Sequence, residues 1–158
     1  MKLNGKSIAL SIGLCIVLLI VLIAEFSIFS SGPSRKHEEE VQNQITVIQE
    51  KYHDIKNLYR DAFYYITYIG EDSENYVWFN EKGQAIISKE KSSLKMNEVK
   101  QIAQKDYNIE NAEITLGYGY DNPVYIITDG KTEIRLDYDD LHEVYYLLEG
   151  EPDGKMVE

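Results

Sequence analysis

The side chains that most often carry catalysis are few in this sequence, and their spacing assembles no catalytic or metal-binding motif. His37, His53 and His142 stand far apart, and none has a second histidine or a cysteine at the spacing of a zinc site. The one cysteine, Cys15, lies inside an apolar run. These residues predict neither a zinc centre nor a cysteine nucleophile in the polar part of the chain.

A serine and a lysine do occur at the Ser-x-x-Lys spacing of one class of acyl-transfer enzymes. Ser92 stands three residues before Lys95, but the Ser-Asp-Asn and Lys-Thr-Gly motifs that complete such a site are absent from the sequence. Serine side chains also cap helix N-termini, and helical spacing follows directly. We interpret Ser92 and Ser93 as the start of a helix rather than as a nucleophile.

Two further clusters suggest ligands, and their spacing argues against both. Asp137, Asp139 and Asp140 offer carboxylates, but the stretch lacks the glycine and the final glutamate of a helix–loop–helix calcium loop. Gly117 and Gly119 follow strand alternation and open no helix, which argues against a phosphate site and favours close packing. The sequence therefore predicts a protein that is not an enzyme and holds no metal or cofactor.

An apolar run at residues 8–29 dominates the N-terminal part. In a helix its roughly 22 residues extend about 33 Å, enough to cross a hydrocarbon core of about 30 Å. The run predicts a transmembrane helix over residues 7–29 in contact with the lipid bilayer. Lys2 and Lys6 precede it, so residues 1–6 are expected to be cytoplasmic and the rest extracellular. A cleaved signal peptide is the alternative, but the run is too long and lacks a small-x-small site.

The rest of the chain is strongly acidic. Residues 37–158 contain 26 Asp and Glu against 12 Lys and Arg, a net charge of −14. Such a surface argues against binding nucleic acid and against docking on anionic lipid. All thirteen tyrosines lie in this part, and no cysteine does. We therefore expect a domain without disulfides that depends on a tyrosine-rich core.

Helical periodicity follows a short linker at residues 30–36. Apolar side chains recur at steps of three and four and share one helical face: Val41, Ile45, Ile48, Tyr52, Ile55 and Tyr59. One interpretation is that this face packs on a sheet. The alternative is a short coiled coil that pairs two copies of the chain into a homodimer through the helix at residues 41–59.

Strand patterns then follow on either side of a second helix. The predicted strands cover residues 62–69, 75–79 and 84–89 before that helix, and 112–120, 124–128, 131–138 and 143–148 after it. Asp129 and Gly130 suit a two-residue hairpin loop that would set Tyr125 opposite Ile134 and Ile127 opposite Thr132. The pattern predicts an α+β fold of two units, 37–91 and 92–150, with a loose tail at 151–158.

This arrangement resembles the YpmB/TseB-like family of cell wall elongation regulators of Gram-positive bacteria. The similarity covers nearly the whole chain, from the basic N-terminus and the single span onward. It is carried by Phe63-Tyr-Tyr-Ile-Thr-Tyr-Ile-Gly70 and by residues 75–83, 97–103, 112–117, 123–125 and 134–137. Residues 137–143 depart from the family pattern, because such units usually turn there through a glycine. Lys95 departs too, because it is a poor helix cap.

The resemblance implies two PepSY-like or cystatin-like units, each a helix packed on an antiparallel sheet, behind a membrane anchor. It implies a non-catalytic, peptidoglycan synthesis regulator that contacts a class B penicillin-binding protein. The alternative is an inhibitor of a secreted or membrane protease. An exposed sheet edge or a tyrosine-rich patch would make the contact. The candidate residues are Tyr64, Trp78, Tyr118 and Tyr120.

Overall fold

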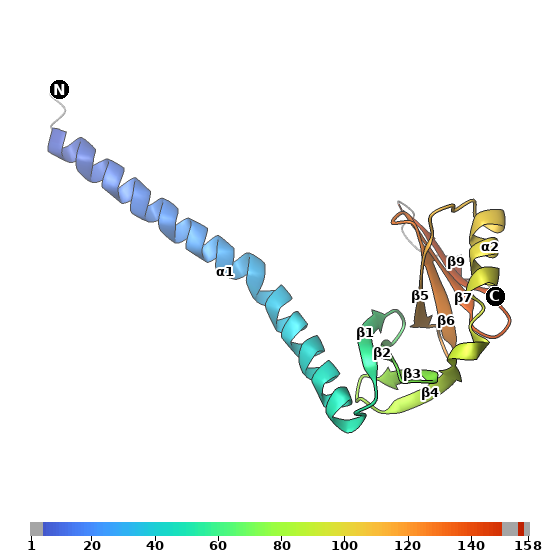
Figure 1. The fold of residues 1–158 in the computed structure, drawn as a ribbon. Helices are drawn as coiled ribbons and strands as arrows, with labels where there is room; N and C mark the ends of the chain where they lie inside the picture. Colours follow the sequence, from blue (N-terminus) through green and yellow to red (C-terminus); the bar gives the residue numbers. More distant parts are fainter. Residues whose placement is uncertain (1–4, 150–154, 157–158) are drawn as a thin grey trace. The chain divides into compact units, whose positions relative to one another are not determined.

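The computed structural model describes the backbone of residues 5–149 and 155–156, and the side chains of residues 13–23 and 38–149. The chain divides into two units, Met1–Asn43 and Gln44–Glu158. The elements, most of which are labelled in Figure 1, are α1 (Gly5–Lys51), β1 (Lys56–Ala62), β2 (Ile66–Glu71), β3 (Asn75–Asn80), β4 (Ala85–Glu90), the short 3₁₀ turn η1 (Lys91–Ser93), α2 (Met96–Asp106), β5 (Glu113–Tyr118), β6 (Pro123–Thr128), β7 (Thr132–Asp137), β8 (Glu143–Leu148) and β9 (Lys155–Met156).

The long helix α1 corrects the prediction for the N-terminal part. Within the described ranges, no helix combines the length and the apolarity needed to cross a membrane. The transmembrane helix predicted over residues 7–29 is therefore wrong. The backbone of residues 30–36, expected to be a linker, continues the helix.

The last turns of α1 belong to the second unit and pack on its first sheet, which has the antiparallel order β1-β2-β3-β4. Ile48 is fully buried, and the Tyr52 ring lies 5.0 Å from that of Phe79. At Gly83, where φ is +68°, an added Cβ would lie 3.0 Å from Ile48. These contacts confirm the interpretation in which the helical face packs on a sheet. Pairing of two copies through residues 41–59 stays a prediction.

The helix ends earlier than its periodicity predicts. Residues 56–62 form β1, so Tyr59 lies on a strand, where it pairs with Ile69 of β2. The single strand predicted at residues 62–69 is in fact the turn between β1 and β2 followed by most of β2. The spacing of Tyr59 fits a helix, whereas its pairing with β2 decides its conformation.

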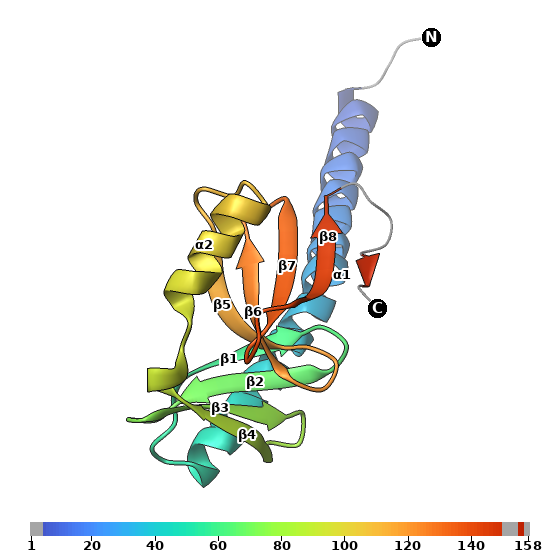
Figure 2. The ribbon, with the colours of Figure 1, turned by 90° about the vertical axis from the view of Figure 1, so that its right-hand side faces the viewer.

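The second sheet has the antiparallel order β5-β6-β7-β8-β9, and α2 lies along one face of it (Figure 2). Val99 and Ala103 of α2 are fully buried in one core with Tyr125, Ile127 and Ile134 of the sheet. The predicted α+β class with two antiparallel sheets is thus confirmed. Of the predicted loose tail, only residues 155–156 lie within the described part, and they pair with β8 as β9.

The start of α2 differs from the prediction. Lys95 occupies the N-cap position, and its backbone N–H donates to the Tyr125 hydroxyl at 2.9 Å. Ser93 lies in η1, where its hydroxyl donates to the Glu90 carbonyl oxygen at 2.7 Å and contacts the Tyr138 hydroxyl at 2.9 Å. The predicted serine cap is therefore absent, and the Tyr125 hydroxyl of β6 binds the N-cap residue instead.

The hairpin between β6 and β7 is shifted by two residues from the predicted register. Ile127 pairs with Ile134, and Tyr125 pairs with Leu136. The Asp129 carboxylate accepts hydrogen bonds from the backbone N–H groups of Lys131 and Thr132, which lengthens the loop beyond two residues. Because the shift is an even number, the buried face is the same as predicted.

Side chains of the first sheet bind the backbone of β5 in the second. The Tyr59 hydroxyl donates to Leu116 O, and Trp78 Nε1–H donates to Gly117 O, both at 2.8 Å. The Tyr118 N–H donates to Asp61 Oδ2, also at 2.8 Å. An added Cβ at Gly117 would lie 2.7 Å from that same carboxylate oxygen, so the glycine permits this close approach. The second unit is therefore held together across its two sheets.

Candidate protein-binding surface

An aromatic cluster projects from the turn between β1 and β2 and from the end of β5. We call it the tyrosine surface; its residues are Phe63, Tyr64, Tyr65, Tyr118 and Tyr120. The side chains of Tyr64 and Tyr65 are 65% and 53% exposed. The Tyr64 ring lies 4.8 Å from that of Tyr65 and 5.4 Å from that of Tyr120. These rings support one another while presenting aromatic area to solvent.

A buried ion pair lies directly beneath the tyrosine surface. Arg135 of β7 donates to both Asp61 carboxylate oxygens, at 2.9 and 3.1 Å, and both side chains are more than nine-tenths buried. The guanidinium also lies 4.1 Å from the centre of the Phe63 ring. Burial disfavours the guanidinium charge, but the hydrogen bonds donated to Asp61 outweigh it and raise the pKa of Arg135. The guanidinium therefore stays charged where it lies against the Phe63 ring.

A groove of about 560 Å³, the tyrosine groove, runs alongside this surface. Its walls include Tyr65, Tyr118 and Tyr120, and Thr67 also lines it. The Tyr118 hydroxyl donates to the Asp121 carbonyl oxygen at 2.7 Å. Burial, and then the Asp121 charge, raise the pKa of Tyr118, so its phenol stays neutral at physiological pH. The groove therefore has aromatic walls, of which the neutral Tyr118 ring is held in place by its own hydrogen bond.

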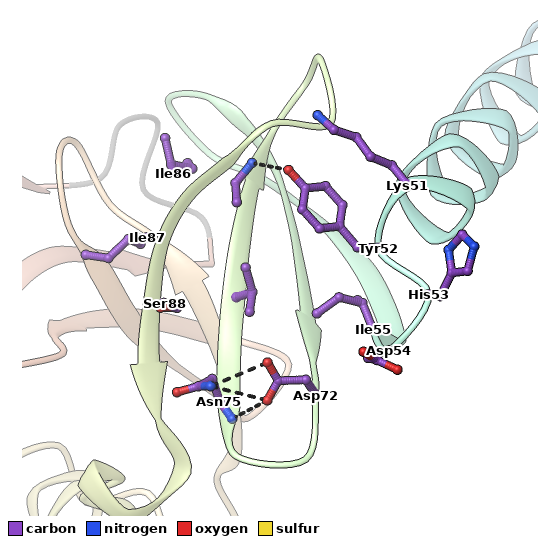
Figure 3. Close-up of a pocket in the computed structure, with 12 residues that line it drawn as sticks. Lys51, Tyr52, His53, Asp54, Ile55, Asp72, Asn75, Ile86, Ile87 and Ser88 are labelled. Carbon is purple, nitrogen blue, oxygen red and sulfur yellow. Dashed lines mark hydrogen bonds between the residues drawn. The ribbon is translucent and has the colours of Figure 1, made fainter.

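A second hollow, of about 700 Å³, lies between the end of α1 and strands β3 and β4 (Figure 3). At one end of it Asp72 and Asn75 face each other, and at the other the Ala85 N–H donates to the Tyr52 hydroxyl at 3.5 Å. The backbone N–H groups of Glu74 and Asn75 lower the pKa of Asp72. Its carboxylate is thus a turn-capping group, and the hollow offers no catalytic acid or base from it.

The acidic turn after β7 places Asp137, Asp140 and His142 within 4.8 Å of one another. Asp137 is buried, and its Oδ1 accepts hydrogen bonds from the N–H groups of Asp139 and Asp140. Leu141 adopts a φ of +66°, the conformation that a glycine would take in a turn of this kind. These contacts account for the carboxylates as supports of a tight turn.

The His142 imidazole gives a pH-dependent prediction. A hydrogen bond to the exposed Asp140 carboxylate raises the pKa of His142 above its ordinary value of about 6.5. Because the folded-state pKa is raised, the contact stabilises the fold fully below the unfolded pKa and is lost as pH rises through the folded one. We expect an NMR titration to give a midpoint above 6.5, and Asp140→Asn to lower it. An unchanged midpoint in Asp140→Asn would contradict this pairing, whereas Glu110→Gln serves as the charge-matched control.

The structure brings together three of the four residues predicted to make contact. Tyr64, Tyr118 and Tyr120 belong to the tyrosine surface, whereas Trp78 is fully buried in the core and is not a surface candidate. Phe63 and Tyr65 were missed, although they flank Tyr64 in the same aromatic run. That run was interpreted as a strand, which would have sent alternate side chains to opposite faces.

Comparisons with family models, curated proteins and solved structures find no match to this chain. The resemblance to the cell wall elongation regulators therefore stays a prediction.

Proposed function

We propose that this chain is a non-catalytic accessory protein that binds a class B penicillin-binding protein and so modulates cell wall elongation. The observation that carries the binding part is the tyrosine surface. Its two outermost rings, Tyr64 and Tyr65, are each more than half exposed. The choice of partner is supported by the family resemblance alone.

Exposed tyrosines that touch one another are suited to protein recognition. Each ring buries a large apolar area on contact while its hydroxyl keeps a hydrogen-bonding group, and tyrosine is enriched among the residues that dominate binding energy. Here the Tyr120 ring contacts the exposed Tyr64 ring, and it is itself packed against Phe63 with ring centres 5.3 Å apart. A supported aromatic group loses little side-chain freedom on binding, which favours affinity.

Catalysis has no comparable support among the described residues. Asp72, in the hollow beside α1, and Asp137, in the acidic turn, both accept hydrogen bonds from backbone N–H groups of their own turns. His142 is bound to the exposed Asp140 rather than to a nucleophile. The best-supported function is accordingly recognition of another protein.

Photo-crosslinking in cells tests this function. We expect a photoreactive residue at Tyr64 of the full-length chain to capture a protein that a fluorescent penicillin labels, because that reagent acylates the serine of transpeptidases. The double variant Tyr64→Ser/Tyr65→Ser, combined with a photoreactive residue at Tyr120, should lower capture at least tenfold, as expected when two central aromatic contacts are lost.

A photoreactive residue at Gln104, exposed on α2, is the matched control. Equal capture of the transpeptidase from Gln104 and from Tyr64 would show that the tyrosine surface is not the contact. Recovery of a secreted or membrane protease in place of a transpeptidase would overturn the choice of partner and favour the inhibitor alternative.

A further inference from the structure

We propose that the tyrosine groove binds an extended peptide segment through an arginine side chain, which lies against the tyrosine rings and pairs with carboxylates at the rim. This inference rests on the proposed function, because it describes the part of a protein partner that would enter the groove. It is carried by the shape of the groove, its aromatic walls and the charges around it.

The shape suits a side chain with its backbone rather than a whole domain. A volume of about 560 Å³ falls within the range of sites that hold small ligands. The groove lies between the β1–β2 turn and the loop after β3, and its apolar wall includes the exposed Ile86 of β4. An extended segment can therefore lie along the groove and place one long side chain between the walls.

The walls favour a planar cation. Tyrosine faces carry negative electrostatic potential and attract guanidinium groups, more so when the contact is shielded from water. The second unit already contains such a contact, since Arg135 lies 4.1 Å from the Phe63 ring centre. Tyr65, Tyr118 and Tyr120 offer further rings in the groove, and of these Tyr118 is fixed by its hydrogen bond to Asp121 O.

The charges around the groove favour the same ligand. Glu81 and Asp121 are exposed carboxylates at the rim, and Lys82 is the one basic residue among the described residues that line the groove. The net charge of −14 over residues 37–158 adds a long-range attraction for a basic segment. Arginine fits better than lysine, because its planar fork both stacks on a ring and binds a carboxylate through two N–H groups.

The groove also contains an unsatisfied polar group. Thr67 is 2% exposed, and its hydroxyl has no hydrogen-bond partner within the part of the chain that the structure describes. A buried hydroxyl without a partner is unfavourable.

Calorimetric titration of the full-length chain tests the inference. The probe is a capped hexapeptide of alternating arginine and serine, compared with the same peptide carrying lysine or glutamate in place of arginine. We expect the arginine peptide to bind, the lysine peptide to bind several-fold more weakly, and the glutamate peptide not to bind. Equal affinity for the arginine and lysine peptides would overturn the stacking geometry.

Matched variants separate a groove from general charge attraction. Asp121→Asn and Tyr65→Leu should each weaken binding of the arginine peptide about threefold to tenfold, whereas Glu110→Gln, an equal charge change outside the groove, should leave it unchanged. Equal losses in Asp121→Asn and Glu110→Gln would overturn the site.

If Tyr64 captures a transpeptidase but the arginine peptide does not bind, this inference fails and the proposed function stands. If the peptide binds in the groove but no transpeptidase is captured, the inference stands and the proposed partner is wrong.

Discussion

Replacing Asp61 with alanine is expected to lower the free energy of unfolding by about 3–5 kcal/mol, the usual range for removing one partner of a buried ion pair. The variant leaves the Arg135 guanidinium buried without its carboxylate, although Glu133 still accepts from Arg135 Nε at 2.8 Å. The Tyr118 N–H also loses its acceptor. Urea denaturation followed by circular dichroism measures the change.

The double variant Asp61→Leu/Arg135→Met separates the cost of an unpaired Arg135 charge from the cost of the lost acceptor for the Tyr118 N–H. Apolar residues of similar volume often replace a buried ion pair at little cost, so we expect this variant to recover most of the lost stability. Tyr118 would remain without its acceptor, which limits the recovery by about 1–3 kcal/mol. A loss in Asp61→Ala below about 1 kcal/mol would mean that the ion pair contributes little to the fold.

Replacing Trp78 with alanine is expected to cost about 3–5 kcal/mol, since a fully buried aromatic side chain leaves a cavity. Trp78 also packs edge-on against Tyr138, at 5.9 Å between ring centres, and donates to Gly117 O. Trp78→Phe keeps much of the volume but removes the donor, so a smaller loss is expected. Because Trp78 is the single tryptophan, unfolding is again followed by circular dichroism.

Tyr64→Ala is the control for the Trp78 variants, because it removes a large aromatic side chain that is mostly exposed. Its effect on the free energy of unfolding should stay near 0.5 kcal/mol, the usual limit for surface positions. Losses of similar size in Tyr64→Ala and Trp78→Ala would show that Trp78 is not the central core residue that its burial indicates.

Much of the second unit was predictable because its elements follow simple periods. Strands β3 to β8 match alternating or apolar stretches, and α2 matches a helical stripe. The β6–β7 register was missed because the Asp129 carboxylate binds two backbone N–H groups, which sequence alternation does not reveal. Strand β1 was missed because local spacing there fits a helix, and pairing with β2 decided otherwise.

The N-terminal error has a different origin. The drop in apolarity after residue 29 predicted that the helix would end at a linker, whereas the backbone continues as one helix from Gly5 to Lys51. Helical backbone preference does not depend on whether neighbouring side chains are apolar or charged, so a change in hydropathy need not mark the end of a helix.

For the candidate surface, the sequence indicated which residue types would make contact but not which of those residues would be exposed. Exposed tyrosines were expected as contact residues, but the prediction could not tell Tyr64 from the buried Trp78, because strand alternation does not say which face a second sheet covers. The pairing of Asp61 with Arg135 joins residues 74 positions apart. No local pattern reports such a contact, although it supports the whole tyrosine surface.

At the junction between the two sheets, the first sheet contributes side chains and the second contributes backbone atoms. The side chains come from Tyr59, Trp78 and Asp61, and they bind backbone atoms of residues 116–118 in β5. Backbone atoms are the same whatever the residue, so the junction itself does not depend on the side chains at positions 116 and 118. Related chains should accordingly keep the first-sheet residues and Arg135 and vary most at the exposed β5 positions Glu113 and Thr115, with Gly117 as the position where any side chain would push the sheets apart.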